Sequence, residues 1–114
     1  PSICLLSAAD LRDIVLLWLP HRHTNYVNAD ISQFVDYVLH CAQNNLMRVG
    51  RTDGRLDYVC IWNVHDPECV HIEFAAGRGA QWAIDRPLIV KGFKYISYER
   101  RGKEYKLSVR ERNN

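Results

Sequence analysis

The sequence has no apolar run long enough to cross a membrane as a helix. Such a span needs roughly 18 consecutive apolar residues, and the longest candidate, residues 14–19, is far shorter. No signal peptide is visible, because no basic stretch is followed by an apolar stretch and a cleavage site. Pro1 is the residue that removal of an initiator Met would leave, so we expect a complete product in the cytoplasm.

The sequence also lacks a Cys-x-x-Cys pair, which argues against a zinc knuckle or a redox motif. Without an export signal, we expect free thiols in a reducing compartment. His21 and His23 form a His-x-His pair, but nothing in the sequence fixes the three or four convergent ligands that a metal needs. We therefore expect no metal site. The cysteines are Cys4, Cys41, Cys60 and Cys69.

No internal repeat, low-complexity tract or linker divides the 114 residues, so we expect one domain over residues 1–114. Its charge is uneven. Residues 1–85 carry 6 basic and 10 acidic side chains, whereas residues 86–114 carry 9 basic and 3 acidic ones. The basic C-terminal part could meet phosphate, nucleic acid or an acidic protein surface. A solvated hairpin has the same composition.

Two amphipathic helices are expected after a short strand over residues 2–6. Ser7 and Asp10 have the spacing of a capping box at the start of the first helix, and Pro20 stops it. Asp30 caps the second helix, whose apolar residues recur at helical spacing, and Asn44-Asn45 ends it.

The remaining sequence is typical of β-structure. Strands are expected over residues 46–51, 56–64 and 69–76, and Asp53-Gly54 is a hairpin signal between the first two. A short helix over residues 81–85 and a hairpin of residues 94–99 and 104–109 follow. This order predicts an α+β domain with a mostly antiparallel mixed sheet and two N-terminal helices.

The two faces of the central hairpin follow from an assumed pairing of Val64 with Cys69. That pairing predicts one apolar face and one face of mixed polarity. A mixed face is typical of a surface that meets a ligand. A face half-covered by a helix would look the same. The apolar face holds Val59, Ile61, Val70, Ile72 and Phe74, and the mixed face holds Tyr58, Cys60, Trp62, His71 and Glu73.

The stretch most informative about function is CVHIEFAAGRGA, residues 69–80. A strand that ends in glycines opening a helix leaves backbone N–H groups free to hold a phosphate. Arg78 could contact that phosphate or face water. A glycine turn that serves only the backbone needs the same residues.

In order along the chain, four segments resemble the GNAT (N-acetyltransferase) superfamily: ICLLSAADLRDIVLL, MRVGRTDGRLDYVCIW, CVHIEFAAGRGA and GFKYISYERRGKEYKLSVR. A more distant likeness is to the toxin-activating lysine acyltransferases, themselves GNAT-like in fold. The resemblance implies a GNAT-like fold with a shortened C-terminal half. It also implies transfer of an acyl group, acetyl first, from acetyl-CoA to an unidentified amine.

The resemblance also assigns roles to residues. Glu73 matches a strand position that often serves as the base, and His71 is the alternative base because imidazoles exchange protons near neutral pH. The pyrophosphate of the cofactor would be held by Phe74, Ala76, Gly77, Arg78, Gly79 and Ala80.

Two departures from the family pattern leave a second interpretation open. Phe74 stands where the family has Gln or Arg, and residues 80–91 are too few for the usual helix, strand and helix. The chain could therefore keep the fold without the chemistry. It would then be a homo-oligomer or a structural component of a larger assembly such as a virion.

A third interpretation is a small nucleic-acid-binding module. Tyr95, Tyr98 and Tyr105 alternate with basic residues, as in surfaces that stack single-stranded bases. Tyr favours strands and Lys protects sheet edges, so ordinary hairpins look similar. The candidate contacts are Lys94, Arg100, Arg101, Lys103 and Lys106.

Overall fold

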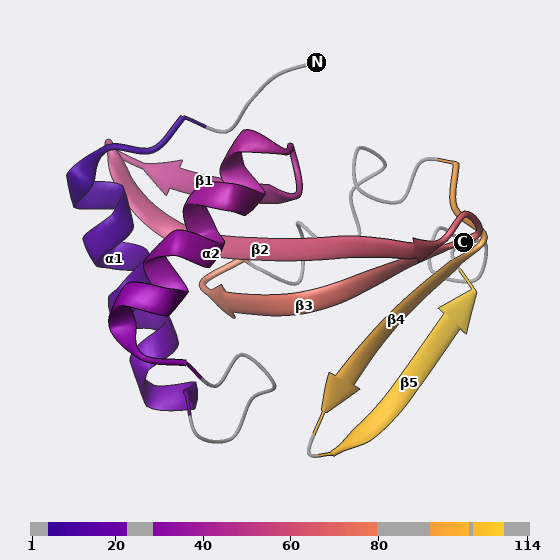
Figure 1. Cartoon of the computed structure of the whole chain (residues 1–114). Helices are drawn as coiled ribbons and strands as arrows, with labels where there is room; N and C mark the ends of the chain where they lie inside the picture. The colour runs from indigo at the N-terminus through magenta and orange to yellow at the C-terminus, as the bar shows by residue number, and fades with distance from the viewer. Residues whose placement is uncertain (1–4, 23–28, 80–91, 101, 109–114) are drawn as a thin grey trace.

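The computed structural model describes residues 5–22, 29–79, 92–100 and 102–108. Two helices come first and five strands follow (Figure 1). None of the described helices has the length and apolar character needed to span a membrane. The elements are α1 (Ala8–Trp18), a 3-10 turn (Leu19–His21), α2 (Ile31–Gln43), β1 (Met47–Thr52), β2 (Arg55–Asp66), β3 (Cys69–Gly77), β4 (Tyr95–Arg100) and β5 (Lys103–Ser108).

Both helices begin at the capping residues that the sequence predicts. Ser7 accepts a hydrogen bond from the Asp10 N–H, and Asp10 accepts one from the Ser7 N–H, which completes the capping box. Asp30 and Gln33 form the same reciprocal pair at α2. The second helix ends at Asn44, followed by Asn45 in the left-handed conformation with φ 55°. These local signals are confirmed.

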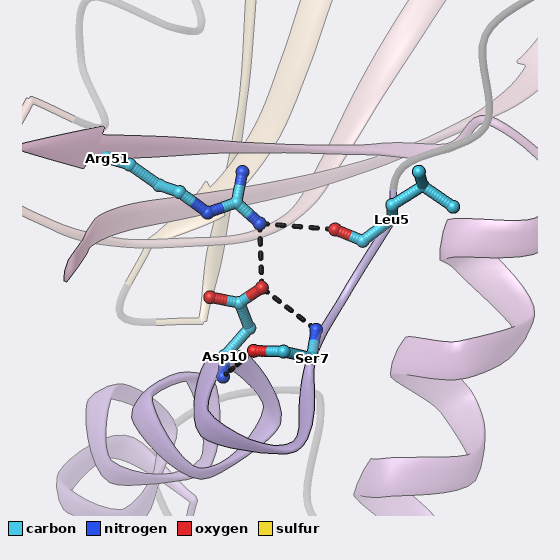
Figure 2. Close-up of polar contacts among 4 residues, drawn as sticks. All are labelled: Leu5, Ser7, Asp10 and Arg51. Atoms are coloured by element: carbon cyan, nitrogen blue, oxygen red, sulfur yellow. Dashed lines mark hydrogen bonds and ion pairs between the residues drawn. The ribbon is translucent and has the colours of Figure 1, made fainter. Parts of the chain in front are cut away.

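The Asp10 carboxylate also ties α1 to the sheet (Figure 2). Its Oδ2 atom lies 2.7 Å from Nη2 of Arg51 on β1. The same Nη2 donates to the Leu5 carbonyl at 3.1 Å. The hydrogen bond from Arg51, and then the one from the Ser7 N–H, lower the pKa of Asp10. One arginine therefore fixes the start of α1 and the backbone that precedes it.

The sheet has the order β1-β2-β3-β4-β5. All neighbours are antiparallel except β3 and β4, which run parallel from Cys69/Tyr95 to Ile72/Tyr98. Beyond that point β3 and β4 diverge, so the β4–β5 hairpin extends away from the helices (Figure 1). The predicted Asp53-Gly54 turn is confirmed, with φ 53° and 78°.

The helices pack on one face of the sheet through aromatic rings. Trp18 and Phe34 stack with centroids 4.1 Å apart, and Phe74 of β3 meets Phe34 edge-on at 6.0 Å. All three side chains are almost completely buried. A second cluster, on the opposite face, consists of Cys60, Val70, Ile72 and Ile96.

The predicted face assignment holds for Val59, Ile61 and Phe74, but a β-bulge at Glu73 makes it wrong for the part of β3 that precedes Phe74. The register passes from Ile61↔Phe74 to Trp62↔Ile72, so Glu73 has no counterpart on β2. An extra residue reverses the alternation of side chains beyond it. Val70 and Ile72 consequently leave the helix-side cluster of Phe74 and join Cys60 on the other face.

The GNAT-like fold class expected from the resemblance is also wrong. Both helices precede all described strands, and Leu5 and Leu6 lie in no strand before α1. The Leu5 carbonyl is bound by the Arg51 side chain, and Leu5 itself is 80% exposed. The helix expected over residues 81–85 lies outside the described residues. The observed architecture is instead two N-terminal helices followed by a five-stranded mixed sheet.

Candidate functional site

A cavity of about 450 Å³ is lined by residues of β3, β4 and β5 and by the end of β2. Both predicted bases, His71 and Glu73, line it. Strand alternation places both residues on one face, and the bulge turns that face toward α2. Bulges often re-aim a side chain beside an active site. The complete lining is Asp66, Cys69, His71, Glu73, Ser97, Glu99, Glu104 and Lys106.

Tyr37 of α2 orients the Glu73 carboxylate. The Tyr37 hydroxyl donates to Glu73 Oε1 over 2.6 Å, a distance typical of a charge-assisted bond. Burial, and then this hydrogen bond, raise the pKa of Tyr37. The phenol therefore stays protonated and remains a donor. No sequence pattern singles out Tyr37, because helical spacing marks it only as part of an amphipathic helix.

His71 contacts a serine, Ser97, that no sequence pattern marks. His71 Nδ1 lies 2.7 Å from Ser97 Oγ, and Cys69 Sγ donates to the same oxygen at 3.4 Å. The parallel register places Ser97 directly beside His71. No sequence signal for this pair exists, because it depends on a parallel pairing between strands 26 residues apart.

The cavity carries an excess of negative charge. Four carboxylates line it, against the single ammonium group of Lys106. Asp66, Glu99 and Glu104 are exposed, whereas Glu73 is half-buried. Such a rim raises the local concentration of cationic ligands. The half-buried Glu73 carboxylate lines the same cavity as the His71 imidazole and the Ser97 hydroxyl.

The described cysteines are buried thiols. Cys41, Cys60 and Cys69 are free among the described residues, and Cys4 lies outside them. Burial, and then the Glu73 carboxylate, raise the pKa of Cys41 to about 11. Burial raises the pKa of Cys60 to about 12. Both thiols are therefore poor nucleophiles at neutral pH.

The predicted phosphate loop packs closely against β2. Gly77 has φ +97°, and a Cβ there would collide with the Asp57 carbonyl. The Arg78 N–H donates to that carbonyl at 2.9 Å, so a phosphate could not use it without breaking this bond. The Phe74 side chain lies in the core, Ala76 packs against the core, and Ala80 lies outside the described residues.

Arg78 and Gly79 nevertheless border a second cavity, of about 400 Å³, at the β1–β2 end of the sheet. Arg48 lines it as well, and so does Arg51, which already pairs with Asp10. Guanidinium groups bind phosphates through paired hydrogen bonds. The anion-binding capacity of this region therefore resides in arginine side chains.

The predicted basic surface of the hairpin is partly engaged in contacts within the protein. Lys94 pairs with Glu68 at 3.2 Å, and Lys106 lies 4.6 Å from the centroid of the Tyr95 ring. Lys103 lies 5.4 Å from the centroid of the Tyr105 ring. Arg100 is exposed, and Arg101 lies outside the described residues.

Within residues 5–22, 29–79, 92–100 and 102–108, no group of three or more His, Cys, Asp and Glu side chains is arranged to hold a metal ion. His23 of the His-x-His pair lies outside these ranges. Comparison of the chain with protein-family models, curated proteins and solved structures finds no match.

Proposed function

We propose that this protein transfers an acyl group from a thioester to an amine bound in the cavity between β3, β4 and β5. The observation that carries the proposal is that His71 and Glu73 line one cavity under a rim of carboxylates. Acetyl-CoA, the donor implied by the resemblance to acyltransferases, is the first thioester to test.

The rim favours an amine as the acceptor. An amine is mostly protonated at neutral pH, and Glu99 and Glu104 stand at the exposed side of the cavity to attract it. The ammonium must lose a proton before its nitrogen can attack a carbonyl carbon. Glu73 or His71, deeper in the same cavity, accepts that proton.

Tyr37 supports the role of Glu73 as a base. Its hydrogen bond occupies one oxygen, Oε1, and restricts the rotation of the carboxylate. The second oxygen then has a defined direction in which to accept a proton. A base held in position by a further hydrogen bond is a common arrangement in catalytic sites.

The acyl donor would contribute phosphates. The side chains of Arg48 and Arg78, at the second cavity, suit phosphate binding better than the loop backbone does, because the Arg78 N–H is already bonded to Asp57. The two cavities share no lining residue. Phosphate contacts and acyl-transfer chemistry are therefore separable by experiment.

Two donors separate these contributions: acetyl-CoA and S-acetyl-N-acetylcysteamine, a thioester without phosphates. We expect an Arg48→Gln/Arg78→Gln variant to weaken acetyl-CoA binding in calorimetry about tenfold or more. Turnover of the short thioester should be unchanged. Equal acetyl-CoA affinity for wild type and variant would remove these arginines from the proposal.

A panel of primary amines tests the acceptor, with amide product measured by mass spectrometry. Glu99→Gln/Glu104→Gln should raise KM for cationic amines with little change in kcat, because these carboxylates attract the amine without touching the reacting atoms. Glu68→Gln is the matched control, since Glu68 pairs with Lys94 outside the cavity. No product with any amine, together with no heat on adding acetyl-CoA, would reject the enzyme. A stable oligomer would then favour a structural component.

A further inference from the structure

We infer that Ser97 is a nucleophile, activated by His71, that carries the acyl group as a covalent ester before the amine receives it. The inference rests on the proposed function for the identities of the acyl donor and of the amine acceptor. It requires a hydroxyl in contact with a base, inside a cavity that a substrate can enter. Ser97 is the described hydroxyl that lines the His71 cavity.

The contact between the two residues has the geometry of proton transfer. Ser97 Oγ and His71 Nδ1 are 2.7 Å apart, within the range for a nucleophile and its general base. With Nδ1 as acceptor, the hydroxyl donates to it and its lone pairs remain available. Cys69 Sγ lies 3.4 Å from the same oxygen and can donate to one of its lone pairs. The remaining lone pair is available for attack.

The surrounding fold holds this pair in place. His71 and Ser97 are direct neighbours in the parallel register of β3 and β4, with paired residues both before and after them. Ser97 is 4% exposed and has little freedom to rotate. A site on paired strands is positioned more accurately than one on a loop. The lining of the cavity extends along the strands on both sides of this pair, to Cys69 and to Glu73.

The two half-reactions balance. Ser97 Oγ attacks the thioester carbonyl, its proton passes to His71 Nδ1, and the carbon–sulfur bond breaks. The departing thiolate takes the proton and leaves as a thiol, with an ester on Ser97. The amine then attacks the ester carbonyl and gives a proton to Nδ1. The carbon–oxygen bond breaks, and that proton returns to Oγ, which leaves an amide product and the starting serine.

Mass spectrometry of the full chain, treated with acetyl-CoA in the absence of an amine, tests the inference. We expect the mass of one acetyl group, mapped to Ser97 and resistant to neutral hydroxylamine, which cleaves thioesters. Ser97→Ala should lose the adduct, while Ser108→Ala on β5 should retain it. His71→Gln should slow acylation about 10²- to 10⁴-fold, the usual contribution of a general base.

Two outcomes would overturn the inference. One is an acetyl group on Cys69, cleaved by neutral hydroxylamine and retained in Ser97→Ala. The other is undiminished amide formation by Ser97→Ala, which would leave the proposed function in place with direct transfer.

Labelling of Ser97 with a fluorophosphonate and with p-nitrophenyl acetate separates the donor from the nucleophile. If both reagents modify Ser97 in wild type but acetyl-CoA does not, the result supports Ser97 as a nucleophile and rejects acetyl-CoA as the donor. If neither reagent modifies Ser97, its role as a nucleophile is rejected whatever the donor.

Discussion

The Tyr37 hydroxyl and the Glu73 carboxylate are joined by a hydrogen bond of 2.6 Å that connects α2 to the bulge in β3. Tyr37→Phe removes the donor and leaves a half-buried carboxylate without it. We expect a loss of about 1–3 kcal/mol in the free energy of unfolding, measured by urea denaturation. Tyr105→Phe on the exposed hairpin is the control. Equal stability of the two variants would mean that water replaces Tyr37 at no cost.

The ion pair of Asp10 and Arg51 should make stability depend on acid pH (Figure 2). Folding lowers the pKa of Asp10 below its ordinary value of 3.8. Its contribution is therefore fully present above pH 3.8 and is lost as the pH falls through the lower folded-state pKa. Asp10→Ala removes the acceptor for the Ser7 N–H and for Arg51, and should cost about 1–2 kcal/mol at pH 7.

The difference in unfolding free energy between wild type and Asp10→Ala should shrink below about pH 4, where the Asp10 carboxyl group begins to be protonated in the unfolded protein. Asp13→Ala is the control, because Asp13 lies 3.8 Å from Arg55, whose side chain is 76% exposed. Exposed pairs contribute about 0–1 kcal/mol. A difference that stayed constant throughout the acid range would contradict the role of Asp10 as a charged partner.

The glycine that ends β3 should tolerate no side chain. Gly77→Ala places a Cβ against the Asp57 carbonyl at φ +97°, and we expect a loss of about 3 kcal/mol or more. Gly102 also has a positive φ, +76°, but faces open space, so Gly102→Ala should cost about 1–2 kcal/mol. Thermal denaturation compares them. Equal losses would show that backbone strain alone explains the requirement for glycine.

The rates at which the cysteines are labelled should reflect their burial. The pKa values of Cys41 and Cys60, raised to about 11 and about 12, leave almost no thiolate at neutral pH. Iodoacetamide should therefore modify both residues far more slowly in the folded protein than in urea, as followed by peptide mass spectrometry. Rapid labelling of Cys60 in the folded protein would contradict its burial.

Local patterns made part of the fold predictable. The caps at Ser7 and Asp30 and the turn at Asp53-Gly54 depend on neighbours within a few residues, and all three are as expected. The bulge at Glu73 leaves no such signal, because residues 70–74 alternate apolar and polar side chains as they would in a strand without a bulge. Its effect on Val70 and Ile72 therefore could not be predicted.

The candidate site likewise contains residues that a sequence pattern marks and residues that it does not. His71 and Glu73 could be selected because they stand on one strand near a glycine turn. Ser97 and Tyr37 could not, since they arrive from β4 and α2 through packing that no short pattern encodes. The glycine motif predicts a phosphate loop, but the close approach of the Asp57 backbone is enough to require glycine at position 77.

The most direct test of the central claim is the rate of amide formation from acetyl-CoA and the best amine of the panel, compared between wild type and His71→Gln/Glu73→Gln. Both substitutions keep hydrogen-bonding side chains of similar size, and the amide oxygen introduced by Glu73→Gln can still accept from Tyr37. We predict a fall in kcat/KM of at least about 10²-fold, the smallest usual contribution of general base catalysis. Equal rates in a folded double variant would contradict the account.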